Sequence, residues 1–170
     1  MQVSLLYAEH VRGLVRLAWL LVRDQGLAED IVQDAFVSLH QHWGRLRSPT
    51  SATAYLHRSV VNACRSAGRH RGVEARYLAR ESGRAGGANR WVGPSAEDSA
   101  IERASRRDLM AVIDQLPNRQ REVIVLRYYA GLTEEEIAHV LDISPGAVKG
   151  YAHRAIARLR TTVQATSEQG

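Results

Sequence analysis

The 170-residue sequence has one cysteine, one phenylalanine and few aromatic residues overall. The single cysteine, Cys64, excludes an intramolecular disulfide and is typical of a protein in the reducing cytoplasm. No apolar run approaches the roughly 18 residues that a membrane-spanning helix needs, and the amino terminus lacks a signal-peptide pattern. We therefore expect a soluble cytoplasmic protein with small aliphatic cores and no membrane insertion.

Lysine is also nearly absent, because Lys149 is the only one and arginine supplies almost all of the positive charge. The formal net charge of +5 at pH 7 favours an anionic partner such as nucleic acid. Arginine suits bidentate contacts to phosphate and guanine better than lysine does. The codon bias of a GC-rich genome produces the same arginine excess, so composition alone is a weak indication.

Strand patterns are nearly absent, and helical periodicity covers most of both ends of the chain, which predicts an all-α protein. We expect two small helical domains, over residues 1–72 and 99–164, with a polar tail at 165–170. Residues 73–98 are rich in glycine, serine and arginine and are predicted to form a flexible basic linker that contains Trp91. The chain after residue 160 is expected to fray.

Three helices are predicted in the first domain, over residues 7–22, 28–43 and 54–68, with a loop over 45–53. On the second helix, a spacing of 100° per residue places an acidic strip opposite the apolar face. The strip comprises Asp30, Gln33, Asp34, Val37 and Gln41. Such a strip is usually a solvated helix face, and a docking surface for a basic protein is the alternative.

The exposed side of the third predicted helix combines an aromatic ring, an amide and several guanidinium groups. Its members are Tyr55, Arg58, Ser59, Asn62, Arg65, Ser66 and Arg69. Single-stranded nucleic acid is bound by such groups, because rings stack on unpaired bases, arginine contacts the backbone and asparagine contacts base edges. A merely solvated face more often mixes lysine with glutamate. We therefore expect this strip to contact nucleic acid, mainly through Tyr55, Arg58, Asn62 and Arg65.

Residues 116–160 predict a helix-turn-helix. Thr133 and Glu136 have the spacing of a capping box, which starts a helix. Ser144 and Pro145 start a second helix, because serine is a good N-cap and proline fits the first helical position. Two short helices joined by a tight turn are typical of a motif that reads DNA. An ordinary hairpin with a solvated basic face is the alternative, but caps, turn and cations together favour DNA binding.

The second helix of this motif has a slim predicted centre line, formed by Gly146, Gly150, His153 and Ala157. Glycine inside a helix costs roughly 1 kcal/mol relative to alanine, and close approach to the floor of a DNA groove would offset that cost. Cations border the line on both sides, so base and phosphate contacts are expected. The residues expected to make them are Lys149, Gly150, His153, Arg154 and Arg158.

Together these motifs resemble bacterial sigma factors of the extracytoplasmic-function (ECF) group over nearly the whole chain. LAEDIVQDAF resembles region 2.2, which in that family binds the clamp helices of the RNA polymerase β′ subunit. AYLHRSVVNACR resembles regions 2.3 and 2.4, which melt and hold the minus-ten promoter element. Residues 116–160 are similar to region 4, which reads the minus-thirty-five element and contacts the flap of the polymerase β subunit.

The resemblance implies a sigma factor that binds core RNA polymerase and directs promoter-specific initiation, with no enzymatic activity, cofactor or metal of its own. It assigns the polymerase contacts to Asp30, Gln33, Asp34 and Val37. The minus-thirty-five element would be read as duplex and the minus-ten element as melted single strand. An anti-sigma factor is expected as a further partner. At Gly150 the sequence departs from the family, which commonly has a hydroxyl or basic residue there.

Two other classes of protein fit less well. A LuxR-type helix-turn-helix regulator shares the carboxy-terminal motif, but its receiver or ligand-binding domain would need strands and length that this chain lacks. An enzyme would need a nucleophile and base, and no such set is recognisable. A zinc site is improbable, because its candidate ligands match no usual spacing and one of them lies on a predicted core face. Those candidates are His40, His42, His57 and Cys64.

Overall fold

The computed structural model describes residues 2–46, 48–78 and 109–167, and every regular element in these ranges is helical. The chain divides into two compact units, residues 1–91 and 92–170, so the predicted all-α, two-domain organisation is confirmed. Most of the predicted linker, with Trp91, lies outside the described residues, and the boundaries at 72 and 99 stay predictions. No helix in the described ranges is both long and apolar enough to span a membrane.

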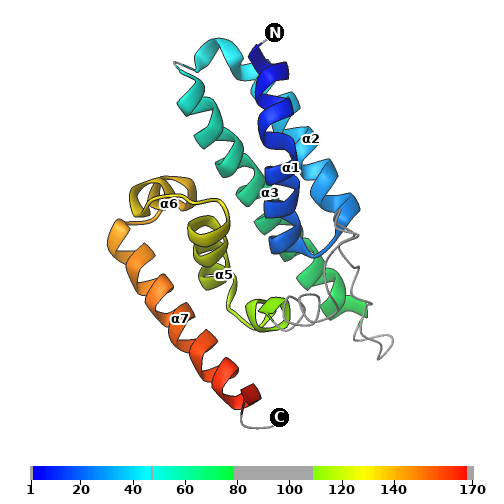
Figure 1. The fold of residues 1–170 in the computed structure, drawn as a ribbon. Coiled ribbons are helices and arrows are strands. Elements are labelled where there is room, and N and C mark those ends of the chain that lie inside the picture. The colour runs from blue at the N-terminus through cyan, green and yellow to red at the C-terminus, as the bar shows by residue number, and fades with distance from the viewer. Residues whose placement is uncertain (1, 47, 79–108, 168–170) are drawn as a thin grey trace, which may run out of the picture. The chain divides into compact units, whose positions relative to one another are not determined.

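The first unit is a three-helix arrangement of α1 (Gln2–Val22), α2 (Gln25–His42) and α3 (Pro49–Leu78). Each of these helices packs against the other two (Figure 1). A short 3-10 turn, η1 (Trp43–Arg45), follows α2. The core is aliphatic, as the shortage of aromatic residues predicts. Its largest fully buried side chains are Leu17, Val32, Leu39, Leu56, Val60 and Val61.

The corner between α1 and α2 is held by Asp24. Arg23, just before it, adopts the left-handed conformation with φ +57°, and its guanidinium lies 4.6 Å from the ring centroid of Trp19. Asp24 then caps α2, because its Oδ1 accepts the backbone N–H of Leu27 at 3.0 Å. The second carboxylate oxygen of Asp24 accepts a hydrogen bond from Arg71 in α3. The Asp24 carboxylate therefore joins α2 to α3, and the same Arg71 guanidinium also contacts the last residue of α1 through the Val22 carbonyl.

Helix α3 begins earlier than the sequence predicted, so the predicted loop over residues 45–53 is wrong from Pro49 onward. Ser48 Oγ accepts the backbone N–H of Ser51 at 3.2 Å, and Pro49 is the first helical residue. This is the same serine–proline start that the sequence indicated for the last helix. The signal was present in the sequence and was outweighed by the local serine and threonine content.

Helix α3 also ends later than predicted, at Leu78 rather than near Gly68. Glycine disfavours a helix by roughly 1 kcal/mol, yet the helix passes through Gly68 without interruption. A tertiary contact supports its far end, because the Arg71 guanidinium donates to the Val22 carbonyl at 3.1 Å and pairs with Asp24. Residues 73–78, which the sequence assigned to the linker, are therefore helical.

The second unit contains a helical segment at residues 109–114, α5 (Asn118–Ile124), a π-helical turn η2 (Val125–Tyr129), α6 (Glu134–Leu141) and α7 (Pro145–Ser167). Helix α7 packs against α5 and α6 (Figure 1). Arg121 closes the end of the first segment, because its guanidinium donates to the carbonyls of Ile113, Asp114 and Leu116 at 3.3, 2.7 and 3.1 Å. The buried core includes Val123, Leu126, Ile137, Leu141, Val148 and Ala155.

The predicted helix-turn-helix is confirmed. Thr133 Oγ1 accepts the N–H of Glu136 at 3.2 Å, and Glu136 Oε2 accepts the N–H of Thr133 at 2.8 Å, which completes the capping box. Asp142 ends α6 in the left-handed conformation with φ +55°. Ser144 Oγ then accepts the N–H of Ala147 at 3.1 Å and caps α7.

Helix α7 continues to Ser167, so the predicted fraying directly after residue 160 is wrong. The hydroxyls of Thr161 and Thr162 donate to the carbonyls of Ala157 and Arg158 at 3.0 and 3.1 Å. These bonds satisfy both hydroxyls inside the helix. No proline or glycine occurs between residues 161 and 167 to interrupt it.

Replacing Asp24 by alanine should lower the free energy of unfolding of the first unit by about 1 kcal/mol, the usual loss for an N-cap. The hydrogen bond from Leu27 and the Arg71 guanidinium lower the pKa of Asp24 below its usual value. The ionised carboxylate therefore stabilises the fold above the unfolded-state pKa, and this contribution is lost as the pH falls through the folded-state pKa. The difference between wild type and variant should shrink in acid.

Urea denaturation followed by tryptophan fluorescence measures this difference, because Trp19 and Trp43 lie in α1 and η1 of the first unit. Asp34→Ala is the matched control, since it removes an exposed carboxylate from the same helix. It should change the free energy of unfolding little. Equal losses from both variants would show that the Asp24 cap contributes nothing specific.

Candidate nucleic-acid interface

The predicted acidic strip lies on the exposed surface of α2. Asp30, Gln33 and Asp34 are exposed, and Val37 keeps 56% of its surface in contact with solvent. The opposite side of the helix is buried in the core at Ala28, Val32, Ala35, Phe36 and Leu39. The helical spacing therefore predicted the face of each of these residues correctly. The strip presents carboxylates around one apolar side chain.

The predicted nucleic-acid strip on α3 keeps Arg58, Asn62 and Arg65 on one face of the helix. Arg58 and Asn62 are exposed, and Arg65 is half-buried. Arg65 Nη1 donates to Asn62 Oδ1 at 3.4 Å, so these two side chains are already oriented together. Each lies three or four residues from its neighbour, which places them along one side of the helix.

Tyr55, the fourth predicted member of the α3 strip, is half-buried and held by α2. Its hydroxyl is hydrogen-bonded to Ser38 Oγ at 2.6 Å. His42 Nδ1 lies 2.8 Å from the Ser38 carbonyl, and the His42 and Tyr55 ring centroids are 6.3 Å apart. The sequence did not indicate this cluster, because it depends on how α2 packs against α3. Part of Tyr55 thus stays accessible to solvent, while its hydroxyl is engaged within the protein.

The first half of α7 presents the predicted duplex-binding residues. His153 and Arg154 are exposed, and the Lys149 side chain is 70% exposed. The Arg154 guanidinium lies 4.9 Å from the ring centroid of Tyr151, within range of a cation–π contact. It also covers Gly150, because a Cβ added there would meet Arg154 Nη1 at 3.4 Å. The expected slim centre line is therefore partly occupied by the guanidinium.

Lys149 also belongs to an ion-pair network that the sequence did not reveal. Its Nζ lies 3.5 Å from Oε2 of Glu134, at the start of α6. The other oxygen of this carboxylate accepts from Arg127 Nη1 at 3.3 Å. The Glu134 carboxylate thus bridges two cations, one from the π-helical turn and one from α7.

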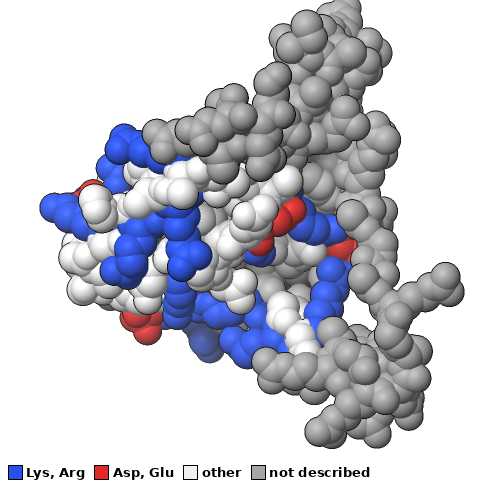
Figure 2. Space-filling view, turned by 90° about the horizontal axis from the view of Figure 1, so that it is seen from below, with Lys and Arg blue, Asp and Glu red and all other residues white. Residues whose placement is uncertain are grey.

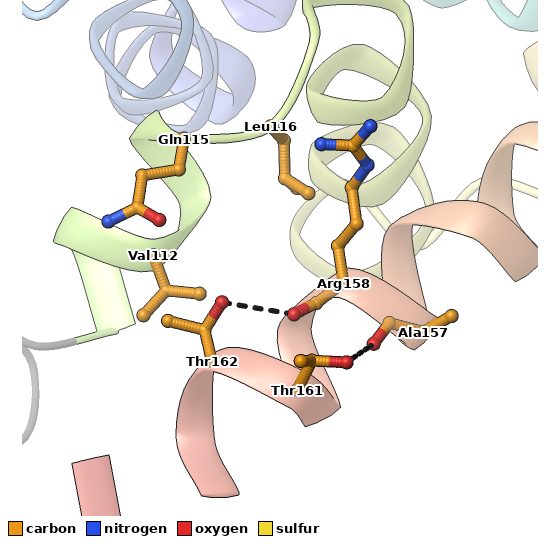
Figure 3. A pocket seen from close by; sticks show the side chains of 7 residues that line it. All are labelled: Val112, Gln115, Leu116, Ala157, Arg158, Thr161 and Thr162. Carbon is orange, nitrogen blue, oxygen red and sulfur yellow. Dashed lines mark hydrogen bonds between the residues drawn. The ribbon is translucent and has the colours of Figure 1, made fainter. Parts of the chain in front are cut away.

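Arg158 is exposed one turn after Arg154, beside a groove with a volume of about 350 Å³ (Figure 3). The groove is lined by Val112, Gln115, Leu116, Ala157, Arg158, Thr161 and Thr162. Figure 3 shows the Arg158 side chain extending away from the threonine pair. Its guanidinium continues the cationic side of α7 by one turn.

Helix α7 carries positive charge without any acidic residue between 145 and 167. In Figure 2 the described surface shows many Lys and Arg atoms and few Asp and Glu atoms. The exposed cations of α7 are Lys149, Arg154, Arg158 and Arg160. Because phosphate contacts dominate the affinity of proteins for DNA, an uninterrupted cationic helix of this kind is suited to a duplex.

Cys64 is buried, and its Sγ donates to the Ala18 carbonyl at 3.9 Å, so it lies in the core as predicted. In the part of the chain that the structure describes, no group of three or more His, Cys, Asp or Glu side chains is arranged to hold a metal ion.

Two family models match the chain, one to each unit. The Sigma-70 region 2 model matches residues 6–73, and the Sigma-70 region 4 model matches residues 106–159. The first match covers α2 and most of α3, and the second covers the helix-turn-helix. A LuxR-type regulator is therefore not favoured, because a region 2 match is not expected for that class.

Relatives of known class extend over nearly the whole chain. The RNA polymerase sigma-E factor of Streptomyces avermitilis is 33% identical over 162 residues, which are 93% of this chain and 85% of that protein. The ECF RNA polymerase sigma factor SigM of Mycobacterium tuberculosis is 35% identical over 155 residues, or 91% of this chain and 73% of that protein. The chain belongs to the sigma-70 family of RNA polymerase sigma factors, in the ECF group. It acts in transcription initiation as a regulatory factor.

Solved structures show the same fold. The sigma factor RpoE from Bartonella quintana, in complex with the anti-sigma factor NepR, matches with a TM-score of 0.76 at 22% identity, covering 95% of this chain and 96% of that chain. CnrH, in complex with the cytosolic domain of CnrY, matches with a TM-score of 0.67 at 24% identity. The match covers 96% of this chain and 88% of that chain.

Replacing Gly150 by alanine should raise the free energy of unfolding of the second unit by up to about 1 kcal/mol, the difference in helix propensity. The new Cβ would meet only the movable end of Arg154. Gly131→Ala should act in the opposite direction, because Gly131 has φ +69°. Thermal denaturation followed by circular dichroism measures the melting temperature of both variants. A lower melting temperature for Gly150→Ala would contradict this account of Gly150.

Proposed function

We propose that this sigma factor binds core RNA polymerase and reads two promoter elements, the minus-thirty-five element as duplex and the minus-ten element as melted single strand. One observation carries the proposal. Each unit of this ECF-group chain exposes side chains of the kind that bind nucleic acid, on the strip of α3 in the first unit and on the cationic helix α7 in the second. Two contacts on separate units allow one chain to read two elements of the same promoter.

In this proposal the start of α7 enters the major groove of the upstream element. Lys149, His153 and Arg154 reach base edges, and Gly150 allows the helix backbone to approach the groove. Arg158 contacts phosphate on the groove wall. The exposure of these side chains at the start of a capped second helix supports the assignment.

The α3 strip captures unstacked bases of the non-template strand at the minus-ten element. Arg58 and Arg65 contact the backbone, Asn62 contacts a base edge, and the ring of Tyr55 offers a stacking surface. Capturing an extruded base stabilises the open duplex, so binding energy drives melting without nucleotide hydrolysis. The Asn62–Arg65 hydrogen bond supports the proposal, because it holds an amide and a guanidinium on one face.

Core polymerase docks on α2 through Asp30, Gln33, Asp34 and Val37, which meet the clamp helices of the β′ subunit, while the second unit contacts the β flap. The support is the exposed apolar side chain of Val37 among carboxylates, because a desolvated apolar contact with a charged surround is typical of protein interfaces. An anti-sigma factor would compete by covering these faces or the DNA-binding ones. The complex of the related RpoE with NepR supports such a partner.

Mixed with bacterial core polymerase, the protein should produce promoter-specific transcripts in a run-off assay on a pool of genomic promoters. Core polymerase without the protein provides the baseline. The assay tests the proposal directly, because a repressor or activator does not confer initiation on core polymerase alone. A transcript pattern identical to the baseline would refute the proposed function.

The double variant Tyr55→Ala, Asn62→Ala should form closed complexes normally but reduce permanganate reactivity at the minus-ten element, because base capture is lost. Tyr55→Phe is the control, since it keeps the ring and removes only the hydrogen bond to Ser38. It should melt the promoter nearly as well as wild type. Undiminished melting by the double variant would remove the strip from the mechanism. A defect in Tyr55→Phe would show that Tyr55 acts through its hydrogen bond to Ser38 in α2.

A further inference from the structure

We propose that Glu134 is a positioning residue that weakens sequence-independent binding of duplex DNA by holding Lys149 and Arg127 on its carboxylate. The inference rests on the proposed function, because it assumes that α7 is the duplex-binding helix. Within that function it assigns Glu134 a role in specificity.

The geometry places the Glu134 carboxylate between the two cations. Each of its oxygens faces one of them, Arg127 Nη1 at 3.3 Å and Lys149 Nζ at 3.5 Å. The Glu134 side chain is only 23% exposed, whereas the Lys149 side chain is 70% exposed. Glu134 is therefore the fixed member of the pair, and the lysine ammonium is the member that can turn toward solvent or a ligand.

Glu134 is not needed to start α6. That task falls to the capping box, in which Thr133 and Glu136 satisfy each other's backbone N–H groups. Glu135 lies in the same first turn and is exposed, so it has the same charge and nearly the same position relative to the helix dipole. The distinguishing property of Glu134 is its contact with two cations.

A carboxylate at this position competes with DNA phosphate for the same cations. Lys149 is proposed to reach a base edge at a promoter site, but on DNA of any other sequence its ammonium can contact only phosphate. To do so it must leave the carboxylate, and the remaining negative charge then lies near the DNA backbone. Sequence-independent affinity comes almost entirely from phosphate contacts, so this competition lowers it. Base contacts by His153 and Arg154 do not involve Glu134, and binding consequently depends more on sequence.

The test uses the full chain carrying Glu134→Gln and a fluorescently labelled duplex of mixed sequence. Binding is measured by anisotropy between about 50 and 200 mM salt, the range over which phosphate contacts have a large effect. The variant should bind about two- to five-fold more tightly, as expected for release of a weak surface ion pair. The slope of log affinity against log salt should steepen by up to about one for each additional phosphate that the released cations neutralise.

Glu135→Gln is the matched control, because it makes the same change in charge one residue away. Equal increases in affinity for the two variants would overturn the proposal, since net charge alone would then explain them. An unchanged or weaker affinity for Glu134→Gln would overturn it as well. Glu134→Ala repeats the test with a better helix former, and circular dichroism verifies that each variant is folded.

Arg154→Ala separates failure of this inference from failure of the proposed function. Arg154 is paired with Tyr151 rather than with Glu134. If α7 binds the duplex, Arg154→Ala should weaken binding even to mixed sequence, because it also removes one of the exposed positive charges that attract the DNA phosphates. Loss of binding in this variant, together with equal behaviour of the two glutamine variants, would reject only the role of Glu134. Unchanged binding by Arg154→Ala would reject α7 as the duplex-binding helix, and the inference with it.

Discussion

The predicted binding faces of this protein lie on helices α2, α3 and α7, and these helices, like α6, begin where a side-chain oxygen accepts a backbone N–H. Asp24 caps α2, Ser48 caps α3, Thr133 caps α6 and Ser144 caps α7. Because a helix turns by 100° per residue, its starting point and direction determine which side chains face the core and which face solvent. The acidic strip, the α3 strip and the cationic side of α7 all lie on helices that begin at these caps.

Features encoded by neighbouring residues could be predicted from the sequence. The capping box and the Ser144–Pro145 start lie within four residues, and both are confirmed. The Ser48–Pro49 start was equally local and was missed because the surrounding residues are typical of a loop. The extension of α3 beyond Gly68 could not be predicted locally, since it is supported by Arg71 and Asp24, which are 47 residues apart in the sequence.

The candidate sites likewise combine local features, which the sequence predicts, with contacts between distant elements, which it does not. Helical spacing predicted that Asp30, Val37 and Asn62 are exposed, because exposure depends mainly on the face of the helix. It could not predict the partners of Tyr55 and Lys149, because those contacts join different elements. The family followed from the order and spacing of motifs over the whole chain, and the matches to regions 2 and 4 confirm it.

The anchor at Arg71 has a mechanical consequence. Helix α3 carries the predicted α3 strip and continues past Arg71 to Leu78. A pull along the chain from residues beyond Leu78 reaches Arg71, fastened to Val22 and Asp24, before it reaches Asn62. The contacts of Arg71 with Val22 and Asp24 at the α1–α2 corner therefore resist that pull before it reaches the α3 strip.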